Sequence, residues 1–350
     1  MQKPANETRA NHAGAACLTS IDPCTILQFV GERSLTRSIK EEARALGFDL
    51  VGVAPVVPSE YGGFYENWLA QGYAGEMVYL ARPDAIAKRR DLRRIMPRVR
   101  SVVVVGQNYY QGSAETLADG QRGRVARYAW GDDYHDLMWP RLNKLGSFVE
   151  AKVGFPVTHR RYVDTGPLLE RELAVRAGLG WFGKNTMLIS PQLGSWLFLG
   201  ELLLDLELEY DLAFGADYCG TCTRCIEACP THCILPGRLL DASRCISYLT
   251  IELKSESVSA QLRSQIGNWV FGCDICQEVC PWNRFARRTL EPAFQPRPGL
   301  PLPELTELLT LDDEAFSRRF GASPIKRAKR RGLQRNAAVV LENLADCAGR

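Results

Sequence analysis

A run of four cysteines that ends in proline constrains this chain more than any other feature. Counted from Cys219, its spacing is C-x2-C-x2-C-x3-C-P, and its last two members are Cys229 and Pro230. A shorter run, C-x2-C-x3-C-P, begins at Cys273, and Cys245 lies between the two runs. Such spacing is typical of proteins that hold two [4Fe–4S] clusters, in which the last cysteine of one run ligates the other cluster. The runs and Cys245 together supply eight cysteines, the number that two such clusters need.

The exchange of cysteines between the runs predicts which residues hold each cluster. Cluster one is expected on Cys219, Cys222, Cys225 and Cys280, and cluster two on Cys229, Cys245, Cys273 and Cys276. Two other uses of the cysteines are disfavoured: zinc sites usually combine two separate C-x2-C pairs, and disulfide frameworks belong to short secreted chains. Four cysteines have no role in this scheme: Cys17, Cys24, Cys233 and Cys347.

Length and composition set only broad limits. With 350 residues, of which 46% are hydrophobic, the chain is long enough for two or three domains with buried cores. The formal charge of +3 says little about partners, because the position of the charges matters more than their sum. No stretch approaches the ~20 apolar residues of a membrane span, and the N-terminus has no apolar signal segment. Since thiolate-held clusters need a reducing compartment, we expect a cytoplasmic protein.

The stretches before the cysteines predict an α/β fold, in the broad sense that includes α+β. Apolar residues recur at helical spacing from Leu35 to Leu46 and stop at Gly47, and further helices are expected at 136–152 and 168–177. The valine run at 102–105 is typical of a strand that is buried on both faces. Strands are expected at 50–54, 101–106, 156–163, 185–190 and 196–205.

These elements predict four parts along the chain. Residues 1–32 show no periodic pattern and are expected to form a loose extension. They are followed by an α/β domain over 33–213, a bacterial ferredoxin-like two-[4Fe–4S] domain over 214–290 and a short, basic, helical C-terminal segment over 291–350.

Basic residues are concentrated in two stretches. Residues 88–100 contain seven basic residues in thirteen, which fits either a solvated helix face or contact with the phosphate of a cofactor or nucleic acid. From Arg318 to Arg335 there are eight basic residues and no acidic one. A solvated tail usually interleaves glutamates, so this second stretch favours nucleic-acid binding.

Two further motifs lie between the first strands and the cysteines. Asp164 ends an expected strand and precedes a turn and a helix, so it could carry chemistry or cap the helix that follows. Gly178 to Gly183 match G-x-G-x-x-G, but the motif follows a helix and leads into a strand, the reverse of a dinucleotide site. Close backbone packing, against the protein or a cofactor, is the better explanation of these glycines.

Together with the cysteines, five sequence motifs give the chain a recognisable family resemblance. They are Asp164-Thr165-Gly166, Gly180-Trp181-Phe182-Gly183-Lys184-Asn185, Gly131-x-Asp133-Tyr134-His135, Arg244 to Thr250 and Ser323-Pro324-Ile325-Lys326-Arg327. From about residue 35 to 345 the chain resembles the epoxyqueuosine reductases. The resemblance implies a cobalamin-dependent iron–sulfur enzyme, related to reductive dehalogenases, that reduces epoxyqueuosine at the wobble position of tRNA to queuosine. The domain over 33–213 would then bind cobalamin and substrate.

The resemblance also implies roles for individual residues. Asp164 matches the proton donor. The matching cobalamin contacts are Arg89, Asp164, Leu188, Leu199, Asp274 and Ile275. The expected tRNA contacts are Tyr248, Lys254, Lys326, Arg327, Lys329, Arg330 and Arg331. His135 begins like the D-x-H-x-x-G loop of many cobalamin proteins, but Met138 replaces the glycine, so a hydrogen-bonding role is expected instead of cobalt ligation.

The expected partners are tRNA and a low-potential electron donor such as a flavodoxin or ferredoxin, and a monomer is expected. Two other functions remain open at this point. A corrinoid reductase of small molecules would share the cofactors, but it would not account for the basic C-terminal segment. A non-catalytic protein that transfers electrons or activates a corrinoid protein would not need a substrate-binding domain before the clusters.

Overall fold

The structure, a computed structural model, describes residues 23–113 and 121–348. Of the predicted N-terminal extension, residues 1–22 lie outside the described residues. Helix α1 (Pro23–Ala45) already begins at Pro23, so residues 23–32 are helical instead of loose. The prediction missed this start because it relied on apolar periodicity, which begins only at Leu35. Proline is well tolerated in the first turn of a helix, where its missing N–H has no partner to lose.

A four-stranded antiparallel sheet forms the centre of the N-terminal half. Its strand order is β1 (Leu50–Pro55), β2 (Ser101–Asn108), β7 (Leu197–Leu204) and β4 (His159–Tyr162). Every residue of β2 is buried, which confirms the prediction of a strand covered on both faces. The strand expected at 156–163 is shorter than predicted, and that expected at 185–190 is reduced to β6 (Leu188–Ile189), which pairs with β5 (Trp181–Phe182).

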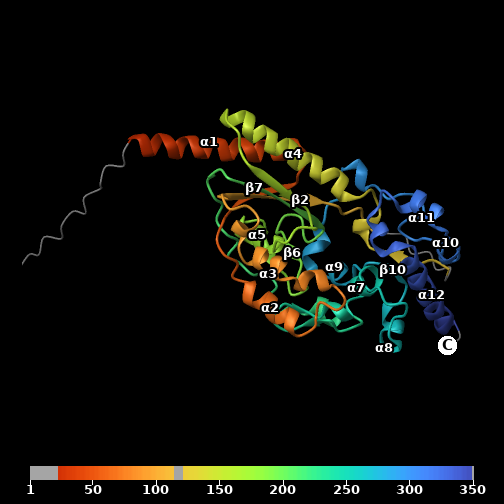
Figure 1. The fold of residues 1–350 in the computed structure, drawn as a ribbon. Helices are drawn as coiled ribbons and strands as arrows, with labels where there is room; N and C mark the ends of the chain where they lie inside the picture. Colours follow the sequence, from red (N-terminus) through yellow and green to blue (C-terminus); the bar gives the residue numbers. More distant parts are fainter. Residues whose placement is uncertain (1–22, 114–120, 349–350) are drawn as a thin grey trace, which may run out of the picture.

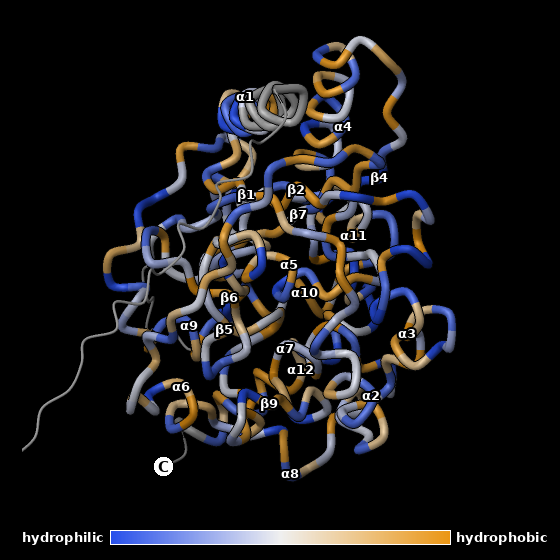
Figure 2. The backbone as a smooth tube through the Cα atoms, turned by 90° about the vertical axis from the view of Figure 1, so that its left-hand side faces the viewer, coloured by the Kyte–Doolittle hydropathy of each residue, from blue (hydrophilic) through white to orange (hydrophobic). Residues whose placement is uncertain are grey.

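Helices cover both faces of the sheet. Figures 1 and 2 show α1 and α4 (Tyr134–Val153) on one face and α5 (Glu170–Arg176) on the other. Met138, Leu142, Leu145 and Val149 of α4 recur at helical spacing and are fully buried against the sheet. On the opposite face α5 approaches β1 so closely that a Cβ on Gly52 would lie 2.1 Å from the Ala177 carbonyl oxygen, which explains the glycine.

The cysteine-rich region and the C-terminal segment share a core with an earlier part of the chain. Strand β10 (Trp269–Phe271) pairs in parallel with β3 (Arg124–Val125), which lies within the predicted 33–213 domain. The core around Phe271 also takes in Trp130 and, from the long helix α12 (Lys329–Ala348), Leu333 and Val340. Residues near 125–130 therefore tie the two halves together.

The remaining elements are short. The strands are β8 (Ile234–Leu235) and β9 (Leu239–Leu240). The helices are α2 (Gly62–Ala70), α3 (Pro83–Arg90), α6 (Arg224–Glu227), α7 (Ile246–Ile251), α8 (Ala260–Arg263), α9 (Ile275–Glu278), α10 (Leu305–Thr310) and α11 (Asp313–Phe320).

Candidate active site

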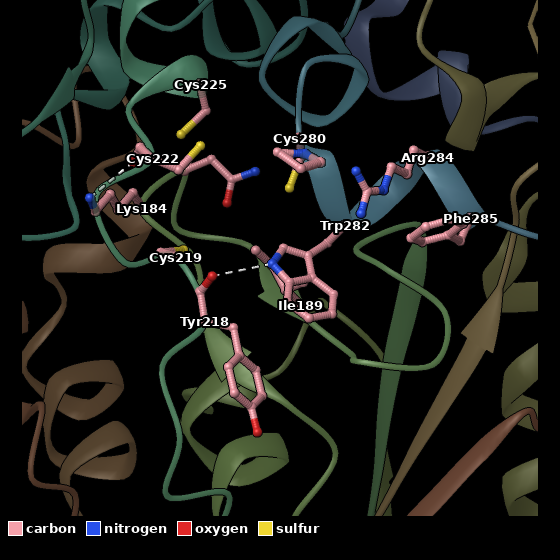
Figure 3. Close-up of a pocket in the computed structure, with 12 residues that line it drawn as sticks. Lys184, Ile189, Tyr218, Cys219, Cys222, Cys225, Cys280, Trp282, Arg284 and Phe285 are labelled. Atoms are coloured by element: carbon pink, nitrogen blue, oxygen red, sulfur yellow. Dashed lines mark hydrogen bonds between the residues drawn. The ribbon is translucent and has the colours of Figure 1, made fainter.

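Four cysteines from the two runs line one cavity of about 420 Å³ (Figure 3). Two of them come from the loop that leads into α6, one lies in α6 itself, and Cys280 comes from the segment after α9. The four are Cys219, Cys222, Cys225 and Cys280. Burial raises the pKa of the Cys225 thiol, and the charges of Cys280, Cys219 and Cys222 raise it further. The fold thus brings together the set of cysteines that the spacing rule assigns to cluster one.

The other four cysteines gather on the inner side of the same region, where α6 packs against α9. Burial raises the pKa of Cys276 well above its usual value, and the charges of Cys245 and Cys229 contribute to the rise. Burial likewise raises the pKa of Cys273, with Cys276 and Cys245 contributing. Cys233, which had no predicted role, is buried with its Sγ 3.4 Å from that of Cys229.

The glycine motif before β6 supports the cluster loop. A Cβ on Gly180 would lie 2.1 Å from the carbonyl oxygen of Ile189, so the close backbone packing expected of these glycines is confirmed. From the same motif, Lys184 Nζ donates hydrogen bonds to the carbonyl oxygens of Gly220 (2.7 Å) and Cys222 (2.9 Å). The motif leads into a hairpin, not from a strand into a helix, and its lysine fixes the loop that carries Cys219 and Cys222.

Asp164 follows β4 in a conformation that few residues adopt. Its φ of 59° lies in the left-handed region, where aspartate is among the better-tolerated side chains. The Tyr134 hydroxyl donates to Asp164 Oδ2 at 2.8 Å, and the Asp164 amide donates to Glu170 Oε1 at 2.6 Å. The alternative that Asp164 caps the next helix is wrong, because the residue at the N-cap of α5 is Leu169. The Asp164 carboxylate is left partly exposed and available.

A pair of carboxyl groups beside Asp164 escaped the sequence analysis. Glu170 opens α5 and Glu201 lies in the middle of β7, the strand on which α5 packs. Among the described residues no group forms a hydrogen bond with either oxygen of the fully buried Glu201, so nothing there compensates a negative charge. Burial and the neighbouring carboxylates raise the pKa of Glu201 well above its usual value. Burial and the charge of Asp164 raise the pKa of Glu170 to about 8.

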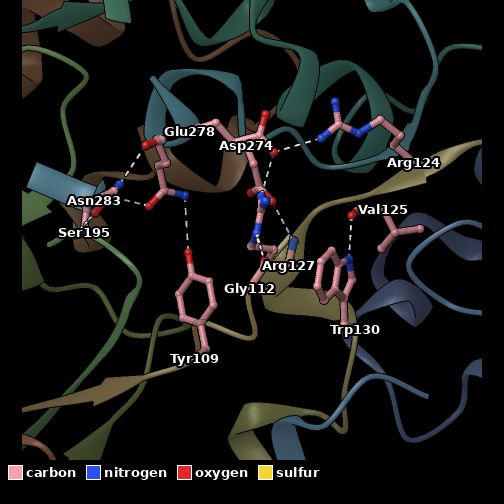
Figure 4. A network of polar contacts seen from close by, with 11 residues as sticks. Tyr109, Gly112, Arg124, Val125, Arg127, Trp130, Ser195, Asp274, Glu278 and Asn283 are labelled. Atoms are coloured by element: carbon pink, nitrogen blue, oxygen red, sulfur yellow. Dashed lines mark hydrogen bonds and ion pairs between the residues drawn. The ribbon is translucent and has the colours of Figure 1, made fainter. Parts of the chain in front are cut away.

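A buried ion-pair network holds the loop between Cys273 and Cys276 (Figure 4). Asp274 Oδ2 accepts hydrogen bonds from the Arg127 amide at 2.8 Å and from Arg127 Nη1 at 2.9 Å. Arg127 also donates to Glu278 Oε1 at 2.7 Å and to the Gly112 carbonyl oxygen at 2.7 Å. Burial raises the pKa of Asp274 to about 6 despite the opposing charge of Arg127. The Asp274 carboxylate is therefore committed to Arg127, which leaves its backbone for any contact with a cofactor.

Tyr128 connects this network with Asp164. Burial raises the pKa of Tyr128 well above its usual value, and the charges of Asp164 and Asp274 both add to the rise. Nearby, Leu199 is the one residue of β7 that is not fully buried, although β7 is a central strand. An apolar side chain that stays partly exposed in the middle of a sheet offers a surface on which a flat ring could lie. Leu188 is buried in the same core, and Ile275 is half-buried beside the cysteines.

Arg89, a predicted cobalamin contact, and His135, considered as a cobalt ligand, both contact other residues of the protein. Arg89 Nη1 donates to the Ala85 carbonyl oxygen at 3.3 Å, and its guanidinium lies 5.2 Å from the centre of the Tyr65 ring. Among the described residues, Arg89 forms no hydrogen bond or ion pair with Asp164. His135 has its Nδ1 2.7 Å from Asp133 Oδ1, so it makes the hydrogen bond expected of it.

The predicted tRNA contacts differ in accessibility. Tyr248 is 6% exposed, and its hydroxyl accepts a hydrogen bond from the Glu76 amide at 2.8 Å, which leaves it little surface for RNA. A Cβ on the adjacent Gly75 would lie 2.5 Å from that hydroxyl, so Tyr248 fixes the turn at 75–76. Lys254 is exposed next to this turn, where its amide donates to Glu76 Oε2 at 2.6 Å.

Several positive charges of the basic C-terminal stretch are paired with acidic residues of other segments. Lys326 pairs with Asp133 at 2.7 Å, Arg327 with Glu252 at 2.8 Å and Arg330 with Asp313 at 2.6 Å. The stretch itself contains no acidic residue, but the fold supplies acidic partners from other segments. Lys329 and Arg331 are exposed. Within the described residues no helix is long and apolar enough to cross a membrane.

Two family models match the chain. The model described as "Epoxyqueuosine reductase QueG, DUF1730" matches residues 89–165, which include Asp164. The model described as "4Fe-4S double cluster binding domain" matches residues 218–283, which contain all eight predicted cluster cysteines. The two matches thus cover both parts of the candidate site.

Curated proteins and solved structures agree with these matches. An epoxyqueuosine reductase from Pseudomonas aeruginosa is 44% identical over 312 residues, which is 88% of this chain and 85% of that protein. One from Synechocystis sp. is 42% identical over 296 residues, which is 83% of this chain and all of that protein (100%). The crystal structure of an epoxyqueuosine reductase with an epoxyqueuosine-modified stem loop of tRNA-Tyr has a TM-score of 0.82 and 31% identity, covering 90% of this chain and 83% of that one. By sequence and by fold, this chain belongs to the epoxyqueuosine reductase family.

Proposed function

We propose that this protein reduces epoxyqueuosine in tRNA to queuosine. Its membership in the epoxyqueuosine reductase family carries the proposal, and one of its structural relatives was solved with an epoxyqueuosine-modified stem loop. The reaction replaces an epoxide by a carbon–carbon double bond, so it needs two electrons and a source of protons. Side chains cannot supply the electrons, which makes redox cofactors necessary.

The chain's residues fit the cofactors that this reaction needs. Four thiols around one cavity suit a [4Fe–4S] cluster, whose iron atoms are held by cysteine thiolates. We assign Cys219, Cys222, Cys225 and Cys280 to cluster one and Cys229, Cys245, Cys273 and Cys276 to cluster two. The apolar face of a corrin would suit the surface formed by Leu199, which is partly exposed in the centre of the sheet, together with Leu188 and Ile275. Bound cobalamin would supply the low-potential cobalt centre that opens the epoxide.

Asp164 is the proposed proton donor. Its carboxylate is partly exposed, held from one side by the Tyr134 hydroxyl and connected through Glu170 to a buried acid. A carboxylic acid that protonates the oxygen as the C–O bond opens avoids release of a free alkoxide, and such general acids contribute roughly 10²–10⁴-fold in rate.

The tRNA is proposed to contact the exposed basic residues of the C-terminal stretch. Lys329 and Arg331 have accessible charges, and Lys254 is exposed on the neighbouring segment. A phosphate must displace or share a carboxylate partner when it contacts Lys326, Arg327 or Arg330. These three residues therefore contribute less to binding than Lys329 and Arg331. Tyr248 is proposed to act indirectly, by fixing the turn at 75–76.

Electrons are proposed to enter at cluster one, because its cavity opens beside exposed side chains. Arg284 and Phe285 lie at this cavity (Figure 3), and Phe285 is 67% exposed with the Arg284 guanidinium 4.5 Å from its ring centre. Arg287 and Arg288 are exposed a few residues further on. A basic and aromatic surface of this kind fits an acidic carrier such as a flavodoxin or ferredoxin. The protein is further proposed to be a cytoplasmic monomer.

One experiment tests the function directly. Protein purified without oxygen is reconstituted with iron, sulfide and cobalamin, and it is given a low-potential reductant and tRNA that carries epoxyqueuosine. Nucleoside analysis by mass spectrometry is expected to show conversion to queuosine that depends on both cobalamin and reductant. Bound cofactors without any such conversion would contradict the proposal.

A further inference from the structure

Epoxide reduction to an alkene consumes two protons. Both C–O bonds break, one C=C bond forms, two electrons enter from the reductant, and the oxygen leaves as water. The first proton converts the alkoxide into a hydroxyl group, and the second allows that hydroxyl to leave as water, which departs far more readily than hydroxide. Asp164 holds one proton at a time, so a second donor must act within the same turnover.

Glu170 and Glu201 lie where such a donor is needed. Glu170 Oε1 accepts a hydrogen bond from the Asp164 amide at 2.6 Å, and its helix α5 packs on β7, which carries Glu201. Glu201 is fully buried on β7, and among the described residues no N–H or O–H group donates to it. A carboxylate in that position would be an uncompensated buried charge, which is prohibitively costly, so Glu201 is held in the protonated form.

We propose that Glu170 and Glu201 form a proton store that recharges Asp164 between the two proton transfers of one turnover. The proposal rests on the proposed function. Glu170 is only half-buried and lies between the enclosed Glu201 and the exposed Asp164, so it can pass a proton forward and regain one from solvent. Glu201 keeps a second proton at the pair and enters no contact with the substrate.

The charged groups around the pair favour this state. Asp164 raises the pKa of both glutamates, because an added negative charge nearby disfavours their ionisation. Arg171 lowers the pKa of Glu170 less than burial and Asp164 raise it, and it donates to the Thr186 carbonyl oxygen at 2.5 Å. The Tyr134 hydroxyl donates to Asp164 instead of to the pair.

Another glutamate of the same helix shows what a structural role looks like. Glu172 is also buried, but its carboxylate accepts hydrogen bonds from the Ser59 hydroxyl (2.5 Å) and the Glu60 amide (2.9 Å) and pairs with Arg176 (2.6 Å). Among the described residues nothing comparable compensates Glu201. Glu172 is therefore a matched control: a buried carboxyl group of α5 whose oxygens are held by hydrogen-bond donors and an arginine.

The test compares Glu170→Gln, Glu201→Leu and Glu172→Gln in the reconstituted holoenzyme. In the wild type, kcat is expected to fall as pH rises through about 8, because Glu170 donates only while protonated. Glu170→Gln keeps the acceptor for the Asp164 amide but releases no proton, so kcat should drop by about tenfold or more and lose that pH limb, with KM for the tRNA unchanged. Glu201→Leu removes the stored proton and leaves Glu170 in place, so kcat should fall while the falling limb of the pH profile remains.

Infrared spectroscopy gives a second readout that does not depend on turnover. Glu201 should give a carboxylic-acid C=O band that persists across this pH range. The wild type should show a second such band, from Glu170, at neutral pH that disappears as pH rises through about 8, and that band should be absent in Glu170→Gln and retained in Glu172→Gln. A Glu170→Gln enzyme with wild-type kcat and the same pH limb would overturn the store, as would a wild type without the band. A wild type that converts no epoxyqueuosine would instead overturn the proposed function, and the store with it.

Discussion

The cluster region and the acid site were built in opposite ways. Seven of the eight cluster cysteines lie in two short runs, so their arrangement follows from local spacing, and the cavity that cluster one would occupy opens near the surface. The acid site takes one residue each from a turn, α5 and β7, and its innermost member is fully buried. Cysteine ligation tolerates a flexible loop because the metal cluster itself organises it, whereas a shared proton needs rigid elements. The cluster region and the acid site can therefore be tested by separate substitutions, each with its own measurement.

The largest effect is expected from Cys280→Ser. Because Cys280 faces Cys219, Cys222 and Cys225, its loss should damage cluster one and abolish turnover, while cluster two persists. Iron content and electron paramagnetic resonance of the reduced protein measure both clusters. Cys233→Ser is the control, a buried cysteine outside either set, and should retain both signals. Loss of cluster two in Cys280→Ser would show that the assignment between the runs is wrong.

Asp164→Asn tests the acid site alone. The amide keeps the size of the side chain but cannot donate a carboxylic proton, so kcat should fall by about 10² or more. Iron content and the amount of bound cobalamin should match the wild type, because the change touches neither cysteine set and conserves the size of the side chain. Asp136→Asn replaces an exposed carboxylate in the first turn of α4 and should keep full activity. An Asp164→Asn enzyme as active as this control would exclude Asp164 from catalysis.

The same contrast explains what the sequence could and could not predict. The cysteine sets, the buried strand β2 and the close packing at Gly180 follow from local patterns, and the structure agrees with them. Glu201 had a local signal, a single acid within the apolar stretch Leu197–Leu204, but its partner Glu170 comes from another element. The acids that pair with Arg327 and Arg330, and the pairing of β3 with β10, join distant segments and leave no trace in spacing.

Arg127→Met probes how firmly the cluster-two loop is held. It leaves the buried Asp274 without its ion pair, and removal of one partner of such a pair costs about 3–5 kcal/mol. The free energy of unfolding, measured by denaturant titration without oxygen, should fall by that amount. The loss should grow as pH rises through about 6, the pKa to which burial already raises Asp274, because the ionised form then lacks its partner.

Arg124→Met is the matched control for Arg127→Met. Arg124 pairs with Glu278 at 2.8 Å from a more exposed position, with 27% of each side chain accessible. Partly exposed ion pairs contribute about 0–1 kcal/mol, so this change should cost little. Equal losses in the two variants would mean that the buried network does not hold the loop between Cys273 and Cys276.

The smallest effect is expected at the C-terminal stretch. Replacing Lys329 and Arg331 together by alanine should weaken tRNA binding and flatten the dependence of log affinity on log salt by about one to two units, since each phosphate contact contributes a slope of about −0.7 to −0.9. Arg327 and Arg330, replaced together, should change the slope less, because Glu252 and Asp313 already compensate their charge. Fluorescence anisotropy of a labelled anticodon stem loop over a salt series measures both. A larger change for the paired arginines would mean that tRNA displaces their carboxylate partners, and that the ion pairs of the free protein keep this surface ready for RNA.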